Sequence, residues 1–171
     1  MSDKTPLSQL PRLPLWLALP AFGLGSGYSP KAPGTLGSLV GVVIFAGLAA
    51  LPLPFYLALL LLTTLAGIGI CQAAADRLGV HDHGGIVWDE FVGQWIALLP
   101  LVPVAAWDAP PLVAVGLGFA LFRLFDIWKP WPVRVADRRV EGGLGIMLDD
   151  LIAGAMAAVV LWLLLPVLAG L

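Results

Sequence analysis

Charged residues are scarce in this 171-residue chain: Asp, Glu, Lys and Arg together make up 12% of it, where a soluble domain has about a quarter. Hydrophobic residues make up 60%, and the mean hydropathy is +0.96. Such a composition cannot cover the surface of a protein of this size with side chains that favour water. It therefore excludes an ordinary soluble domain, and we expect lipid as the main solvent, no nucleic-acid partner and no obligate protein partner.

Cysteine is also nearly absent, since Cys71 is the only one, so no disulfide framework is expected. Cys71 and Arg77 match the C-x5-R spacing of cysteine phosphatases, but the residues between them are Ala-rich and continue an apolar segment. That chemistry needs a loop that cradles phosphate and activates the thiol, so we reject it. Residues 81–83, His-Asp-His, lack the further His or Cys of a zinc site, and we interpret them as polar surface. The chain has no G-x-S-x-G motif for acyl transfer.

Long apolar runs are what the chain has instead. At about 20 residues for each spanning helix, its length accommodates four or five spans. We predict an all-α, polytopic transmembrane helical bundle, formed by a single membrane-embedded domain over residues 1–171, with an N-terminal interfacial or re-entrant helix. That helix and the five candidate spans, of which the first is marginal, are in order Leu13–Leu24, Gly37–Leu51, Phe55–Ala75, Ile86–Trp107, Leu112–Trp128 and Leu148–Leu168.

The basic residues alternate between the loops that join these segments. They occur in three connections, around positions 31, 77 and 129–139, whereas the connections at 51–54 and 108–111 and the C-terminus contain no Lys or Arg. Loops rich in Lys and Arg remain in the cytoplasm. We therefore predict that the three basic connections are cytoplasmic, which requires Gly37–Leu51 to cross the membrane. The basic residues are Lys31, Arg77, Lys129, Arg134, Arg138 and Arg139.

Five carboxylates lie at the ends of the predicted spans, all on the cytoplasmic side. A charged Asp at bilayer depth costs roughly 2.5–3.5 kcal/mol even on lenient insertion scales, so such residues usually face a polar cavity or bind a cation. Because hard divalent cations such as Mg²⁺ prefer oxygen ligands, we predict a divalent-cation site. Its candidate ligands are Asp89, Glu90, Asp126, Asp149 and Asp150.

Helix capping is the alternative for some of these acids. An Asp in the first turn of a helix is stabilised by the helix dipole, which accounts for Asp89 and Asp149 taken alone. It does not account for Asp126, which falls at the C-terminal end of its predicted helix, where a carboxylate is disfavoured. Metal binding explains the whole set better than capping does.

Two bases accompany the acids. Arg123 and Asp126 are three residues apart and share a helix face, and Lys129 follows at the mouth of the span. Arg123 can pair with Asp126 or grip two phosphate oxygens with its planar fork, and these interpretations do not exclude each other. Lys31 lies in a Gly/Pro-rich loop that could bring backbone N–H groups and an ammonium group to an anion, although composition alone favours a plain membrane-surface turn.

Four ordered motifs resemble the phosphatidylglycerophosphatase A family, and together they cover the chain from about Gly23 to Gly154. They lie at Gly25–Ser38, Ile86–Gly93, Phe122–Pro132 and Gly142–Asp150. The resemblance implies a Mg²⁺-dependent lipid phosphatase that converts phosphatidylglycerophosphate into phosphatidylglycerol during phospholipid biosynthesis. It also implies a multi-pass protein of the bacterial cytoplasmic (inner) membrane, with its site facing the cytoplasm.

We expect metal-assisted hydrolysis of a phosphate monoester, with either water or an aspartate as the nucleophile. Asp126 and Asp150 are the leading metal ligands. The residues expected to act in catalysis are Arg123, Lys129, Lys31 and Asp126. Those expected to bind the substrate phosphate are Ser26, Lys31, Thr35, Arg123 and Lys129.

Two other classes of protein remain as alternatives. A cation transporter or channel also needs acids within the membrane, but transport sites usually lie near the bilayer midplane, whereas these acids gather at one face beside bases suited to phosphate. A phospholipid phosphotransferase also uses Mg²⁺ and clustered Asp. It would need the spacing D-G-x2-A-R…G-x3-D-x3-D, which this chain does not have.

Overall fold

The computed structural model describes residues 5–6, 9–80, 82–102 and 112–168, and over these ranges the chain is helical with no β-strand. This confirms the predicted all-α class. The α-helices and the two 3₁₀ segments, η2 and η3, are α1 (Leu15–Ala21), η2 (Gly23–Tyr28), α2 (Pro33–Leu48), α3 (Leu53–Leu78), α4 (Trp88–Ala97), η3 (Leu99–Leu101), α6 (Leu112–Trp128), α7 (Val133–Arg139) and α8 (Gly142–Leu168).

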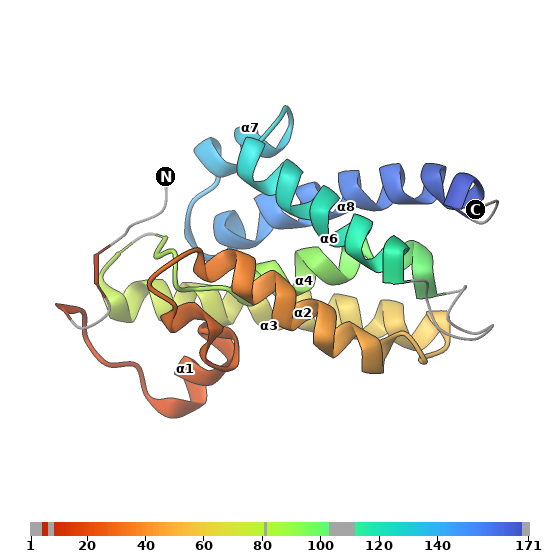
Figure 1. The fold of residues 1–171 in the computed structure, drawn as a ribbon. Helices are drawn as coiled ribbons and strands as arrows, with labels where there is room; N and C mark the ends of the chain where they lie inside the picture. The colour runs from red at the N-terminus through yellow and green to blue at the C-terminus, as the bar shows by residue number, and fades with distance from the viewer. Residues whose placement is uncertain (1–4, 7–8, 81, 103–111, 169–171) are drawn as a thin grey trace.

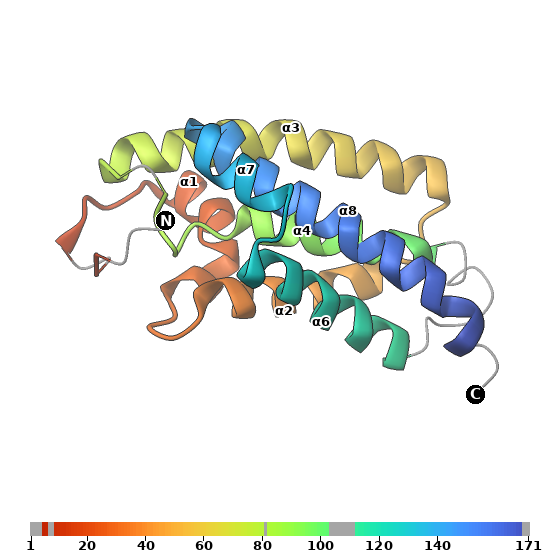
Figure 2. The ribbon, with the colours of Figure 1, turned by 90° about the horizontal axis from the view of Figure 1, so that it is seen from above.

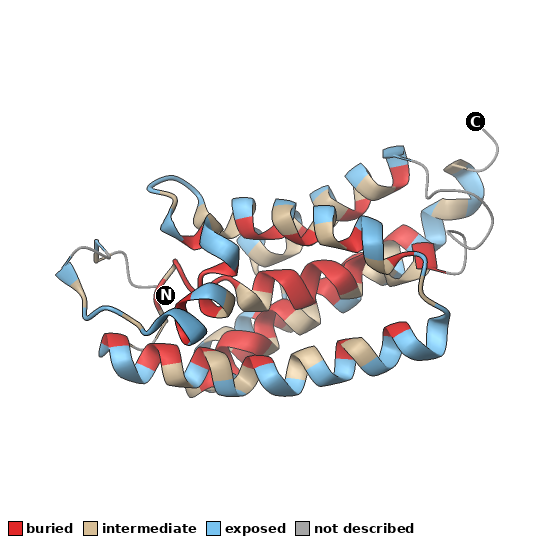
Figure 3. Cartoon of the chain, turned by 90° about the horizontal axis from the view of Figure 1, so that it is seen from below, coloured by how far each residue is buried: buried red, intermediate tan, exposed pale blue. Residues whose placement is uncertain are grey.

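The four longest helices, α2, α3, α6 and α8, run lengthwise through an elongated bundle, with α2 and α8 pointing one way and α3 and α6 the other (Figures 1 and 2). Helix α4 lies among them and is almost entirely buried (Figure 3). Helices α1 and α7 lie at the end where α2, α4 and α8 begin and where α3 and α6 finish (Figure 1). The residues that the sequence places at one depth therefore meet at this end, which we call the acidic end.

Two helices among the described residues, α3 and α8, are long and apolar enough to cross a membrane. Large apolar side chains are exposed on the outer face of α3, among them Leu61 and Leu65, as expected for a surface in contact with lipid. Trp95 does not lie at this surface, because its side chain is buried and its indole N–H donates to the Gly41 carbonyl over 2.9 Å. Trp95 is therefore part of the core.

The predicted continuous span Ile86–Trp107 is wrong. Helix α4 has 10 residues, about 15 Å at 1.5 Å per residue, and it is followed by the 3₁₀ segment η3, which contains Pro100. Proline cannot donate the backbone hydrogen bond that an α-helix needs, and its ring clashes with the preceding turn. Residues 103–107 of the predicted span lie outside the described residues.

The connection between the predicted spans Leu112–Trp128 and Leu148–Leu168 is largely helical, because α7 and the first turns of α8 occupy much of it. As a result Asp149 and Asp150 lie about two turns inside α8 instead of in its first turn. Glycine disfavours a helix interior, but packing against α3 outweighs this preference here. The side-chain oxygen of Gln72 accepts the Gly143 N–H over 2.7 Å, and a Cβ on Gly143 would overlap the backbone of α3.

Helices α4 and α8 approach each other closely where both have glycine. A Cβ on Gly154 would overlap the Gly93 carbonyl, and one on Gly93 would lie 2.9 Å from the Asp150 carbonyl oxygen and 2.7 Å from the Phe122 ring. Backbone atoms cannot move aside as a flexible side chain can. This contact sets the spacing of the two helices that carry Glu90 and Asp150.

Gly154→Ala should therefore destabilise the protein by about 1–3 kcal/mol, the usual cost of overpacking. Gly69→Ala on α3 is the matched control, because its new Cβ would meet no atom within 4 Å, and helix propensity favours Ala by roughly 1 kcal/mol. Reversible unfolding in mixed detergent micelles, followed by tryptophan fluorescence, measures both. Equal stability of the two variants would contradict the close packing of α4 on α8.

Candidate functional site

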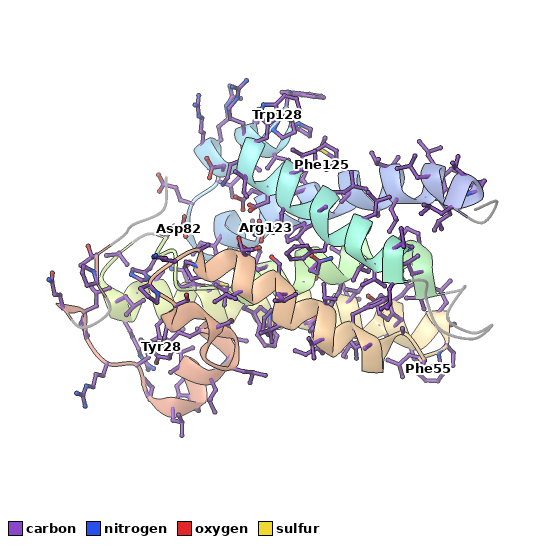
Figure 4. All side chains as sticks on the ribbon, viewed as in Figure 1. Tyr28, Phe55, Asp82, Arg123, Phe125 and Trp128 are labelled. Atoms are coloured by element: carbon purple, nitrogen blue, oxygen red, sulfur yellow. The ribbon has the colours of Figure 1, made fainter. Side chains whose placement is uncertain are left out.

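One cavity of about 1320 Å³ opens at the acidic end, and all five predicted carboxylates line it. They come from α4, α6 and α8, whose positions span 62 residues of sequence, so only the fold brings them together. Arg123 and Lys129 line the same cavity, and Arg123 lies between α6 and α2 (Figure 4).

Three of the carboxylates form the tightest group. Asp126 of α6 and Asp149 and Asp150 of α8 each offer an oxygen within 4.8 Å of the other two. Asp149 and Asp150 are buried and Asp126 is half-buried. Such an all-oxygen donor set suits a hard divalent cation such as Mg²⁺.

Arg123 lies at the centre of a second group of polar side chains. Its Nη1 pairs with the Glu90 carboxylate, lies 3.0 Å from Asp126 Oδ2 and donates to the Ser38 hydroxyl over 3.2 Å. Ser38 in turn donates to Glu90 Oε2 over 2.7 Å. The predicted Arg123–Asp126 pair is therefore present, and Glu90 is held mainly by a cation and a hydroxyl. The sequence analysis missed Ser38, because nothing in its neighbourhood marks it as the partner of a residue 52 positions away.

The first turn of α2 closes one side of this group. Pro33, Gly34 and Thr35 line the cavity, and a Cβ on Gly34 would overlap the Glu90 carboxylate. The first N–H groups of a helix lack partners within the helix and point, with the positive end of its dipole, toward anions. The start of α2 is therefore suited to phosphate.

Lys129 ties three elements together immediately after α6. Its Nζ lies 2.6 Å from Asp149 Oδ2 and also pairs with Asp137 of α7. Burial disfavours its charge, but these two carboxylates outweigh that effect and raise the pKa of Lys129. Lys129 therefore remains a cation that neutralises Asp149. Asp137 was not among the predicted site residues, because its role depends on α7, which is not apparent in the sequence as a helix beside the site.

Negative charge exceeds positive charge in the cavity. Of the described residues that line it, seven are carboxylates, whereas only three, Arg123, Lys129 and Arg138, are arginines or lysines. The seven are Asp82, Asp89, Glu90, Asp126, Asp137, Asp149 and Asp150.

Two buried carboxylate oxygens, Asp89 Oδ1 and Asp150 Oδ2, have no hydrogen-bond partner among the described residues. A buried charged group left unsatisfied is strongly destabilising. A divalent cation would satisfy such oxygens and reduce the charge excess, so the donor set fits one.

Two of the predicted phosphate-binding residues lie apart from the cavity lining. Lys31 is exposed, and the Ser26 hydroxyl donates to the Gly23 carbonyl over 2.9 Å; neither lines the cavity, whereas Thr35 does. The loop 29–32 does reach the cavity through its other residues.

His81, His83 and Cys71 were interpreted as unrelated to catalysis. His81 lies outside the described residues. His83 is buried, with Nδ1 accepting the Gly85 N–H over 2.9 Å and Nε2 2.8 Å from the Thr5 carbonyl oxygen, so its interpretation as polar surface is wrong. Cys71 is buried within α3, which confirms that no phosphate-cradling loop follows it.

Comparison with known proteins agrees with the resemblance seen in the motifs. Residues 19–165 match the family model described as Phosphatidylglycerophosphatase A. A protein of that name from Escherichia coli is 46% identical over 83% of this chain and 79% of its own. Another from Haemophilus influenzae is 42% identical over 95% and 96%. A Bacteroides thetaiotaomicron protein named "Putative phosphatidylinositol-3-phosphatase" is 40% identical over 81% and 87%. No solved structure matches.

Ser38→Ala should lower the free energy of unfolding by about 1–3 kcal/mol, because it leaves a buried carboxylate short of a hydrogen bond. Activity should fall too, since Glu90 and Arg123 lose the hydroxyl that holds them. Thr63→Ala is the matched control, because the Thr63 hydroxyl bonds only to carbonyls of its own helix. If both variants unfold alike and remain fully active, Ser38 does not organise this group.

Proposed function

The chain belongs to the phosphatidylglycerophosphatase A family, and from this we propose that it hydrolyses the terminal phosphate of phosphatidylglycerophosphate, yielding phosphatidylglycerol and inorganic phosphate for phospholipid synthesis. The observation that carries the proposal is the cavity in which a three-carboxylate group lies beside Arg123 and the start of α2. Oxygen ligands for a cation and donors for a phosphate are the two requirements of phosphate monoester hydrolysis.

The cofactor proposed is Mg²⁺, held by Asp126, Asp149 and Asp150, with Asp89 nearby. When bound, it supplies polarisation of the phosphoryl group and neutralises negative charge on its oxygens. Support for it comes from the all-oxygen donor set and from the unpaired Oδ2 atom of Asp150. Glu90 has a different role in this proposal, because Arg123 and Ser38 already engage it.

Arg123 and the first N–H groups of α2 bind the oxygens of the transferring phosphoryl group. Glu90, Asp126 and Ser38 fix the guanidinium through Nη1, which leaves its other donors for the substrate, and the buried Nε has no partner among the described residues. Donors held in place before the reaction stabilise charge in the transition state without reorganising. Lys129 does not contact the substrate in this proposal, and its role is to hold Asp149 in position.

The nucleophile is a water molecule in this proposal. It attacks phosphorus in line with the oxygen of the glycerol, and the P–O bond to that oxygen breaks. The leaving oxygen takes a proton from solvent water, and the proton that the attacking water gives up returns to solvent after the reaction. The Oδ1 atom of Asp89 is the carboxylate oxygen suited to accept the proton of the water, because the protein gives it no other partner in the described region.

The protein is proposed to cross the bacterial inner membrane several times. Helices α2, α3, α6 and α8 and the segment formed by α4 and η3 provide four to five crossings. The basic connections lie at the acidic end, and this supports a site at the cytoplasmic face, because loops rich in Lys and Arg remain in the cytoplasm. Trp16, Trp128 and Trp131 are exposed and lie in the elements gathered there, as expected at the level of the headgroups.

Phosphate release by the purified protein tests the function. We expect release from phosphatidylglycerophosphate in mixed micelles, with phosphatidylglycerol as the lipid product. Phosphatidylinositol 3-phosphate is the informative comparison, given the name of the Bacteroides relative. Faster turnover of the inositol lipid would reassign the substrate, and release from neither lipid would refute the proposal.

Asp126→Asn and Asp150→Asn should each reduce activity by roughly 10²-fold or more, the scale found when one stabiliser of the transition state is lost. Each change keeps the shape of the side chain but removes an anionic ligand. Asp76→Asn is the matched control, because Asp76 is exposed on α3 and does not line the cavity. The measurement is the specific activity of each variant and of the wild type at equal membrane expression. Retained activity in both cavity variants would exclude the three-carboxylate site.

Sidedness can be tested with single cysteines in a Cys71→Ser background. Glu141→Cys, between α7 and α8, should react with a membrane-impermeant thiol reagent only in inverted vesicles. Pro52→Cys, between α2 and α3, should react in intact spheroplasts. Both positions are exposed. The reverse pattern would place the site on the periplasmic face.

A further inference from the structure

An apolar stripe on α6 adjoins the polar cavity. Ala120, Arg123, Leu124, Ile127 and Trp128 line a shallow groove, and their spacing of three and four residues places them on one face of the helix. Leu124, Ile127 and Trp128 are 51%, 69% and 70% exposed. Among the described residues, Arg123 is the only charged side chain that lines this groove.

The groove and the cavity meet at two residues, since Arg123 and Ile127 line both. A phospholipid whose terminal phosphate binds at Arg123 has its glycerol backbone and acyl chains only a few bonds away. Those chains need an apolar surface that begins where the phosphate site ends. The groove is such a surface and leads away from the guanidinium along α6.

Two other sides of the cavity are formed by polar contacts. Lys129 joins the end of α6 to α7 and α8 through Asp137 and Asp149. The segment 82–86 and the N-terminal residue Thr5 form another wall, and His83 joins them. The stripe on α6 offers a continuous apolar surface from the site to the outside of the bundle.

We propose that the α6 groove binds the acyl-glycerol part of the substrate, so that the lipid reaches the site sideways from the bilayer. This inference rests on the proposed function. It makes Ala120, Leu124, Ile127 and Trp128 residues that determine specificity for a lipid over a water-soluble phosphate ester, and assigns them no part in the chemical step.

Two substrates separate tail binding from chemistry: phosphatidylglycerophosphate in mixed micelles, and its deacylated, water-soluble headgroup. Ala120→Trp fills the groove with an indole ring. We expect it to lower kcat/KM for the lipid roughly tenfold, because binding energy from the acyl chains is lost. The kcat/KM for the water-soluble headgroup, which has no acyl chains, should change by no more than about twofold. Leu65→Trp is the control, since Leu65 is also an exposed apolar residue, but on α3 and away from the groove, and it should alter neither rate.

An equal loss on both substrates would show that Ala120→Trp disturbs α6 itself and would overturn the proposal. An unchanged rate with the lipid would overturn it too, and would make the stripe ordinary lipid-facing surface. If the wild-type protein hydrolyses neither substrate, the proposed function fails instead.

Photolabelling tests the same groove without relying on turnover. Phosphatidylglycerophosphate with a diazirine on an acyl chain should label the tryptic peptide Leu124–Arg134, and excess unlabelled substrate should suppress that label. Label on the peptide that contains Leu61 and Leu65 should persist, because bulk lipid reaches α3 regardless. A label on Leu124–Arg134 that competitor does not reduce would overturn the proposal.

Discussion

Buried negative charge is the constraint on which the arrangement of this bundle depends. Seven carboxylates line one cavity at the end of an otherwise apolar protein, and removing a carboxylate from water is costly unless cations or hydrogen bonds replace the solvent. Arg123 compensates Glu90 and Asp126, and Lys129 compensates Asp137 and Asp149. Each base contacts carboxylates on helices that are distant in sequence. The ion pairs that neutralise the acids therefore also hold these helices together.

Small residues make this compensation geometrically attainable. Gly34 lets the first turn of α2 lie against the Glu90 carboxylate, and Gly93 and Gly154 let α4 and α8 touch backbone to backbone. Oxygen ligands from α6 and α8 then come within 4.8 Å of one another. Larger side chains at these glycines would separate the acids from each other and from the bases that neutralise them.

The sequence was sufficient to predict the helical class and the meeting of the five acids, because apolar runs and alternating Lys and Arg place helix ends at common levels. It was insufficient for helix limits, since the end of α4 before Pro100 and the start of α8 at Gly142 depend on local geometry and on packing against α3. Ser38 and Asp137 could not be found either. Their importance comes from partners that only the folded chain brings near.

Direct measurement of cation binding tests the central claim, that the acid cluster is completed by a divalent metal. Purified protein in detergent, freed of metal with a chelator, can be titrated with Mn²⁺ and followed by electron paramagnetic resonance. Our account predicts saturable binding that Mg²⁺ displaces and that Asp150→Asn weakens strongly, with Asp76→Asn unchanged. Absence of saturable binding in the wild-type protein, or equal binding by the Asp150→Asn variant, would contradict it.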